Sequence, residues 1–267
     1  MGGRRLLAVG PAILLAAALE PEARPAAALA LLAGWAVLRW RGHPAAIAWA
    51  AVLPVGLVLP WPGLFGADVP LGAPGCVDPL SVIVLRRAVV AACGLLLVAG
   101  LARAHGSNAA ELGLRPPNLS EAVIAAGAVL LLAVGGLWVG PWLARPFFGE
   151  LDFPTPAAAL VPAVAFGVAN GVLEEVGYRG AMQAWLGRVG PLGWAIGLQG
   201  LVFGIVHAGP DVLALLPVHI ALMTAVGVAG GVARARLGSL WIPIGVHVGA
   251  DIALYVGLAC RAAGAPA

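Results

Sequence analysis

Long uncharged stretches are the feature of this sequence that most restricts its fold. Of 267 residues, 61% are hydrophobic and only 10% are charged, and the mean hydropathy is +0.99. Soluble domains carry roughly 25% charged residues, so a soluble fold is excluded. The stretches are continuous and rich in Leu, Ala and Val, whereas the strands of a membrane barrel alternate in polarity over about 10 residues. The sequence therefore predicts an all-α polytopic integral membrane protein.

Nine apolar runs are candidate membrane spans. A helix needs about 20 apolar residues to cross the hydrocarbon core. The first two runs are short, so we expect eight or nine transmembrane helices. Arg86 and Arg87 fall early in the fourth run, which favours a helix start beyond them. The runs are 5–19, 25–38, 44–61, 80–102, 121–143, 157–178, 192–208, 211–233 and 240–260.

Arginine placement predicts the orientation of the chain. All 15 basic residues are arginine, a bias that points to a GC-rich bacterial genome. We therefore expect a multi-pass protein of the bacterial cytoplasmic membrane with a cytoplasmic N-terminus. Because the arginines are scattered at helix ends, we expect the lipid bilayer, and no nucleic acid, as a partner. With this orientation nine arginines fall on cytoplasmic ends or loops: Arg4, Arg5, Arg39, Arg41, Arg103, Arg115, Arg188, Arg234 and Arg236.

The polar connection 103–120, which contains Pro116-Pro117, divides the chain. We expect N-terminal transmembrane helices of unknown role at 1–110 and a functional core at 111–267. The Gly- and Pro-rich segment 63–79 is expected to be an external loop. The three cysteines are far apart and lack CxxC spacing, so neither a zinc site nor a disulfide framework is expected.

Two adjacent carboxylates, Glu174 and Glu175, lie with Arg179 inside an otherwise apolar run. Ionised side chains at this depth cost on the order of several kcal/mol unless they are paired or face water. Glu175 and Arg179 are four residues apart, which suits an ion pair within one helix. No residue nearby in the sequence neutralises Glu174, so we expect it to be unpaired and free to act.

Two predicted hairpins bring further polar residues to the depth of Glu174. Gly190 marks a helix-breaking turn. Glu174 lies sixteen residues before it and His207 seventeen after it, so each stands about 24–26 Å from the turn. The next hairpin places His247 about 15 Å and Asp251 about 21 Å along a third helix, on one face. We therefore expect Glu174, His207, His247 and Asp251 to converge.

This set of side chains supports hydrolysis by an activated water. A carboxylate in an apolar setting suits a general base near neutral pH, and a neutral histidine beside it can hold the same water. A second histidine and its neighbour can face the oxyanion that develops on a carbonyl. Asn170, one turn before Glu174, could bridge helices or order water, and His219 is expected to be structural.

Two alternatives stay open. The first is a non-enzymatic transporter, immunity factor or scaffold that uses the cluster as a proton or ion site. The second is a divalent metal ion bound by Glu174, His207 and His247 from separate helices. No HExxH motif is present, so we expect no cofactor, with a metal at these three residues not excluded.

Three motifs, in order, resemble those of the CPBP family of intramembrane glutamic endopeptidases, which includes CAAX-processing and bacteriocin-processing (Abi-like) proteins. Glu174-Glu175-x-x-x-Arg179 resembles its EExxxR motif. Phe203-Gly-Ile-Val-His207 resembles FxxxH, and His247-Val-Gly-Ala-Asp251 resembles HxxxN/D. The resemblance covers residues 155–257 and, more loosely, 111–154, where Glu111–Arg115 is similar to a short segment that often precedes the core.

The resemblance implies an endopeptidase that cleaves a protein or peptide substrate near the membrane surface, by C-terminal or leader processing of a membrane-associated protein. A bacterial source argues against prenylated CAAX substrates. Glu174 and His207 would activate water, and His247 and Asp251 would stabilise the oxyanion. An ionised Asp251 would repel an oxyanion, so it should be protonated or orient His247 instead. The supporting residues would be Glu175, Arg179, Asn170 and Phe203.

Overall fold

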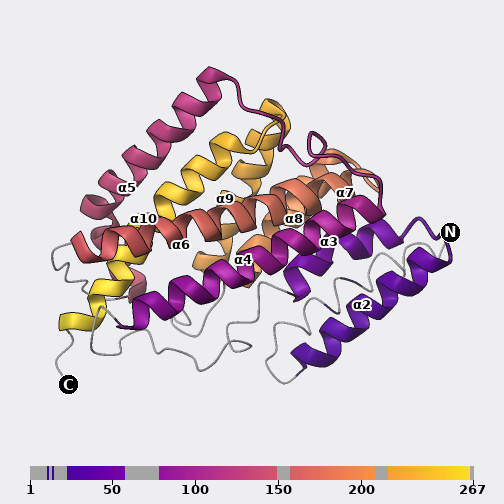
Figure 1. Ribbon diagram of the computed structural model, residues 1–267, viewed down its shortest axis with the longest axis horizontal. Coiled ribbons are helices and arrows are strands. Elements are labelled where there is room, and N and C mark those ends of the chain that lie inside the picture. The colour runs from indigo at the N-terminus through magenta and orange to yellow at the C-terminus, as the bar shows by residue number, and fades with distance from the viewer. Residues whose placement is uncertain are drawn as a thin grey trace.

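The computed structural model describes residues 11, 14, 23–57, 78–148, 157–207 and 216–264 (Figure 1). Every regular element in these ranges is a helix, in agreement with the all-α prediction. The elements are α2 (Arg24–Trp40), α3 (Ala46–Leu57), α4 (Asp78–Ala104), α5 (Leu119–Phe148), α6 (Ala157–Glu174), the π-helix η2 (Glu175–Met182), α7 (Gln183–Gly187), α8 (Leu192–Val206), α9 (Leu216–Leu237) and α10 (Trp241–Gly264).

Within the described residues, each predicted apolar run from 25–38 onward coincides with helical structure apart from one or two residues at its ends. Apart from residues 11 and 14, the first run, 5–19, lies outside the described residues, as does the expected loop 63–79 up to residue 77. The predicted count of eight or nine spans is not confirmed within the described ranges, where helices were compared with the length and apolar composition that a membrane span needs. Four helical stretches there are long and apolar enough to cross a membrane, namely Val84–Ala104, Leu119–Val139, Leu160–Gly187 and Pro217–Leu237. Shorter apolar helices are Pro25–Trp40, Ala46–Gly56 and Leu192–Val206.

Helix α4 begins earlier than the sequence suggested. It starts at Asp78 and runs through Arg86 and Arg87, so the prediction of a start beyond the two arginines is wrong. The Arg87 guanidinium is accommodated because it binds a buried carboxylate of α6. A charge that is paired in this way does not prevent an apolar helix from continuing.

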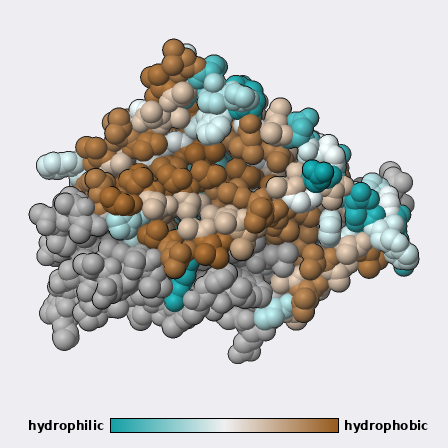
Figure 2. Space-filling model, in the orientation of Figure 1, coloured by the Kyte–Doolittle hydropathy of each residue, from teal (hydrophilic) through white to brown (hydrophobic). Residues whose placement is uncertain are grey.

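The outward surfaces of the helices are apolar. Trp40, Trp138 and Trp142 are 84%, 83% and 72% exposed. Figure 2 shows a broad hydrophobic surface, with hydrophilic residues gathered along the edge that the α4–α5 connection follows. Soluble monomers rarely expose contiguous apolar surface of this extent. This surface, together with the membrane-length helices, is that of a membrane protein.

The α4–α5 connection ties together several helix ends at one end of the molecule. Arg188, which follows α7, donates hydrogen bonds to both carboxylate oxygens of Glu111. Arg234 of α9 donates to the Glu111 carbonyl, and Trp241 Nε1 of α10 donates to the Arg115 carbonyl at 2.7 Å. The segment Glu111–Arg115 therefore fixes the ends of α7, α9 and α10 relative to one another.

A reciprocal capping interaction sets the start of α5. The Glu121 N–H donates to Asn118 Oδ1 at 2.9 Å, and the Asn118 N–H donates to Glu121 Oε2 at 3.0 Å. Such a pair satisfies N–H groups that have no partner within the helix. Arg115 then donates to both Glu121 oxygens at 2.6 and 2.8 Å, so the connection also fixes where α5 enters the bundle.

His105 joins the N-terminal helices to α7 at this same end. Trp35 Nε1 of α2 donates to His105 Nε2 at 3.0 Å, and the Trp185 ring of α7 lies 6.3 Å from the imidazole, centroid to centroid. Burial, and then the positive charges of Arg39 and Arg188, lower the pKa of His105. The neutral ring can therefore keep accepting the hydrogen bond from Trp35 near neutral pH.

Helices α8 and α9 pack at very short range through glycines. A Cβ atom on Gly204 would lie 2.1 Å from Thr224 Oγ1 and 2.7 Å from the Ile220 carbonyl oxygen. A Cβ atom on Gly227 would lie 2.7 Å from the Gly200 Cα. Small residues allow this close approach of two membrane helices, and it places the C-terminal end of α8 beside α9.

Gly204→Ala is expected to lower the free energy of unfolding by about 1–3 kcal/mol, because the added methyl group meets backbone atoms that cannot turn away. The matched control is Gly197→Ala on the same helix, where a Cβ atom would meet nothing within 4 Å. There the change is expected to be neutral or slightly stabilising, since Ala favours helix over Gly. Unfolding in detergent measures both, and equal stabilities would contradict this packing.

Candidate active site

The site is built around a junction between two kinds of helix. The α-helix α6 ends at Glu174, the π-helix η2 follows directly at Glu175, and α7 continues from Gln183. All eight residues of η2 are buried. π-Helical turns are rare and frequently occur at functional sites. The wider turn changes the directions in which Glu175 and Arg179 project relative to Glu174.

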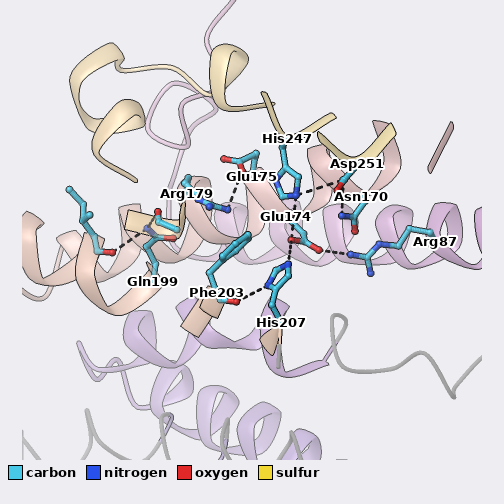
Figure 3. A network of polar contacts seen from close by, with 12 residues as sticks. Arg87, Asn170, Glu174, Glu175, Arg179, Gln199, Phe203, His207, His247 and Asp251 are labelled. Carbon is cyan, nitrogen blue, oxygen red and sulfur yellow. Dashed lines mark hydrogen bonds and ion pairs between the residues drawn. The ribbon is translucent and has the colours of Figure 1, made fainter. Parts of the chain in front are cut away.

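Glu174 occupies the centre of the site and is only 5% exposed. Its Oε1 accepts a hydrogen bond from Arg87 Nη2 at 2.6 Å. Its Oε2 lies 3.7 Å from Nε2 of both His207 and His247 and has no hydrogen-bond partner among the described residues. One carboxylate oxygen is thus held by a cation, while the other faces two imidazole rings (Figure 3).

The expectation that Glu174 is unpaired is wrong, because Arg87 of α4 reaches it from 87 positions earlier in the chain. Sequence spacing identifies partners within one helix, whereas this partner comes from another helix. One signal was available, since Arg87 is itself a charge inside an apolar run with no obvious local partner. Arg87 is the residue of this site that sequence reasoning missed.

Both site histidines are anchored through Nδ1. His207 Nδ1 donates to the Phe203 carbonyl at 2.7 Å, and His247 Nδ1 donates to Glu175 Oε1 at 2.8 Å. These hydrogen bonds assign a proton to Nδ1 of each ring and leave both Nε2 atoms directed at Glu174. His219 Nε2 lies 3.1 Å from the His207 carbonyl oxygen, which is the structural role expected for it.

Arg179 forms the ion pair that its spacing predicts. Its Nη1 lies 3.0 Å from Glu175 Oε1, and the residue is 1% exposed. The guanidinium carbon also lies 4.1 Å from the centroid of the Phe203 ring, a cation–π geometry. The Phe203 ring also lies 4.2 Å from the His207 ring, centroid to centroid, with the two ring planes tilted by 36°. Phe203 therefore couples the position of Arg179 to that of His207.

Asp251 and Asn170 connect α10 to α6 beside His247. Asn170 Nδ2 donates to Asp251 Oδ2 at 2.8 Å, and both residues are buried. The same Oδ2 lies 3.7 Å from His247 Nε2. Of the two roles considered for Asn170, the structure contains the bridge between helices.

The structure brings together every site residue that the sequence singled out, and it adds Arg87 to them. Counting along the two hairpins placed the ionisable groups at one depth, and the 3.7 Å separations confirm that placement. The groups come from α4, α6, η2, α8 and α10 (Figure 3). They are Arg87, Asn170, Glu174, Glu175, Arg179, Phe203, His207, His247 and Asp251.

The donor arrangement also bears on a possible metal ion. Within the described residues, no group of three or more His, Cys, Asp and Glu side chains is arranged to hold one. In addition, Arg87 already places a positive charge on Glu174 Oε1. Glu174 Oε2 and the Nε2 atoms of His207 and His247 are spaced so that one small group can hydrogen-bond to all three.

The helices and this site define a helical membrane protein with a buried carboxylate–imidazole centre. Residues 156–253 match the family model described as type II CAAX prenyl endopeptidase Rce1-like. The match confirms the resemblance to the CAAX-processing proteases and supports intramembrane protease activity in general terms. Comparison with curated proteins and with solved structures finds no significant match.

Proposed function

We propose that the protein is an intramembrane endopeptidase of the glutamic type, in which Glu174 and His207 activate a water molecule. One observation carries this proposal. The buried Oε2 of Glu174 has no hydrogen-bond partner among the described residues and lies 3.7 Å from two imidazole nitrogens. A buried carboxylate oxygen needs a partner, and a water between these three atoms supplies one.

In the proposed reaction Glu174 Oε2 accepts a proton from this water while its oxygen attacks the carbonyl carbon of the substrate. His207 Nε2 accepts the second hydrogen bond of the same water. The tetrahedral oxyanion then collapses, the C–N bond breaks, and the proton held on Glu174 passes to the leaving amine. No side chain becomes covalently attached to the substrate.

His247 is proposed to stabilise the oxyanion. Its ring lies within 3.7 Å of three carboxylates, those of Glu174, Glu175 and Asp251, which favours an imidazolium. That ring donates from Nδ1 to Glu175 and from Nε2 to the oxyanion. Asp251, held by Asn170 with its Oδ2 3.7 Å from His247 Nε2, then orients His247.

We further propose that the reaction needs no metal ion. Arg87 supplies the positive charge that a metal would otherwise provide beside Glu174. Cleavage should therefore survive dialysis against EDTA. If it is lost on dialysis and restored by Zn²⁺, Glu174, His207 and His247 become the candidate ligands instead.

The substrate class that we propose is the C-terminal or leader segment of a membrane-associated protein. The arginine-rich end that contains Arg39, Arg115 and Arg188 is proposed to face the cytoplasm of a bacterium, which also places the N-terminus there. Residues 111–267 are proposed as the protease core. Among the helices before residue 110, α4 contributes Arg87, which binds Glu174.

The test of the function uses purified protein in detergent and the membrane-protein fraction of the expression host as substrate. Mass spectrometry should detect new peptide termini that are absent without the protein. In H₂¹⁸O each new carboxylate should carry one labelled oxygen, and added hydroxylamine should give no hydroxamate, since no acyl-enzyme forms. Hydroxamate formation would contradict the water mechanism. If no new termini appear and the protein reconstituted in lipid vesicles carries a proton or ion flux, a transporter is favoured instead.

A further inference from the structure

Arg87 comes from a different part of the chain than the other residues of the site. It lies on α4, outside residues 156–253 that match the protease family, yet its Nη2 is 2.6 Å from Glu174 Oε1. The Arg87 side chain is 19% exposed, and that of Glu174 is 7% exposed. An ion pair in such a setting is screened far less by solvent than one at the surface.

The surroundings of the pair fix Arg87 against α6. One turn further along α4, Val90 and Ala91 pack with Leu173, the residue before Glu174, in a small buried apolar cluster. Ala91 is four residues from Arg87 and so lies on the same face of α4. The packing of these side chains holds the two helix backbones in register, which in turn holds the guanidinium at Oε1.

A carboxylate that is held at one oxygen cannot rotate freely about its last bond. With Oε1 bound to Arg87, Oε2 stays directed at His207 and His247, as Figure 3 shows. Without the guanidinium, either oxygen could turn away from the imidazoles. The nearby positive charge also favours the ionised form of the carboxylate, the form that can accept a proton.

We propose that Arg87 is a positioning residue for the Glu174 carboxylate, so that the N-terminal portion of the chain completes the hydrolytic site. The proposal rests on the proposed function of Glu174 as general base. It assigns a role to α4 that the matched protease domain does not contain, and it moves the start of the functional unit from residue 111 to α4.

The test compares Arg87→Gln, Arg87→Lys and the control Arg103→Gln in purified protein. Arg103 is an exposed residue near the end of the same helix, and its replacement removes the same charge. The probe is an internally quenched peptide that spans the site cleaved most rapidly in the host membrane fraction. The readouts are kcat, KM and the pH dependence of kcat/KM.

For Arg87→Gln we expect kcat to fall by about 10- to 100-fold with little change in KM, since a misdirected base affects chemistry more than binding. The acid limb of the pH profile should move to higher pH, because one of the charges that favour the ionised carboxylate is gone. Arg87→Lys should keep the acid limb in place and recover part of kcat. Arg103→Gln should behave like the wild type.

An Arg87→Gln enzyme with wild-type kcat and pH profile would overturn the proposal, whereas the proposed function would stand as long as Glu174→Gln abolishes cleavage. Activity of the Glu174→Gln enzyme would instead remove the proposed function. A thermal-unfolding cycle over Arg87→Gln, Glu174→Gln and the double variant needs no substrate. Non-additive shifts support the contact, and additive shifts contradict it even if one variant is too unstable to assay.

Discussion

Glu174→Gln is expected to reduce kcat by about 10²- to 10⁴-fold, the usual contribution of a general base, while the protein remains folded. The amide has nearly the same size as the carboxylate, and its oxygen can still accept a hydrogen bond from Arg87, whose Nη2 lies 2.6 Å from Oε1. It cannot accept a proton from water. The loss should therefore appear in the rate of peptide cleavage and not in the elution profile on size exclusion.

Glu111→Gln is a suitable control for this substitution. Glu111 is bound by Arg188 at the polar end of the molecule, so removing its charge should leave the catalytic rate unchanged. If Glu174→Gln cleaves the peptide within about threefold of the wild-type rate, which corresponds to less than about 1 kcal/mol, Glu174 is not the base. The glutamic mechanism would then be wrong, although a protease of another mechanism would not be excluded.

Arg179→Met is expected to have the largest effect on stability, about 3–5 kcal/mol, because it removes one partner of a buried ion pair. Glu175 is 3% exposed and, among the described residues, would keep His247 as its hydrogen-bond partner. The cation–π contact over Phe203, at 4.1 Å, would also be lost. Unfolding in detergent, followed by helical signal against temperature or SDS fraction, measures the change.

Two further variants separate the charge from the packing in this prediction. Arg179→Met combined with Glu175→Gln should recover part of the loss, since no uncompensated carboxylate then stays buried. Arg236→Met, at an exposed position near the end of α9, should stay within about 0.5 kcal/mol of the wild type. A loss below about 1 kcal/mol for Arg179→Met alone would mean that Glu175 finds another partner.

The helices and the depth of the site were predictable because both depend on distance along the chain. The length of each apolar run predicts a helix. The fixed rise per residue predicts how far Glu174 and His207 lie along their helices from the turn at Gly190. The same arithmetic gives the height of His247. Spacing of four residues gives the Glu175–Arg179 pair, which the structure contains at 3.0 Å.

What could not be predicted depends on which helices are neighbours across the bundle. Rise per residue says nothing about the rotation of one helix toward another, so Arg87 on α4 could not be matched to Glu174. The His247–Glu175 hydrogen bond was missed for the same reason. The π-helix was missed because its wider turn depends on packing, and no local sequence pattern marks its start at Glu175.

The π-helix from Glu175 to Met182 makes the register of the whole site sensitive to chain length. A π-turn accommodates one residue more than an α-turn over the same path. Deleting a single residue in this stretch would restore α-helical winding while α6 and α7 keep nearly the same path. Glu175 and Arg179 would then project in other directions relative to Glu174, although each functional side chain is still encoded. The geometry of the site therefore depends on the number of residues in η2 as well as on the identity of its side chains.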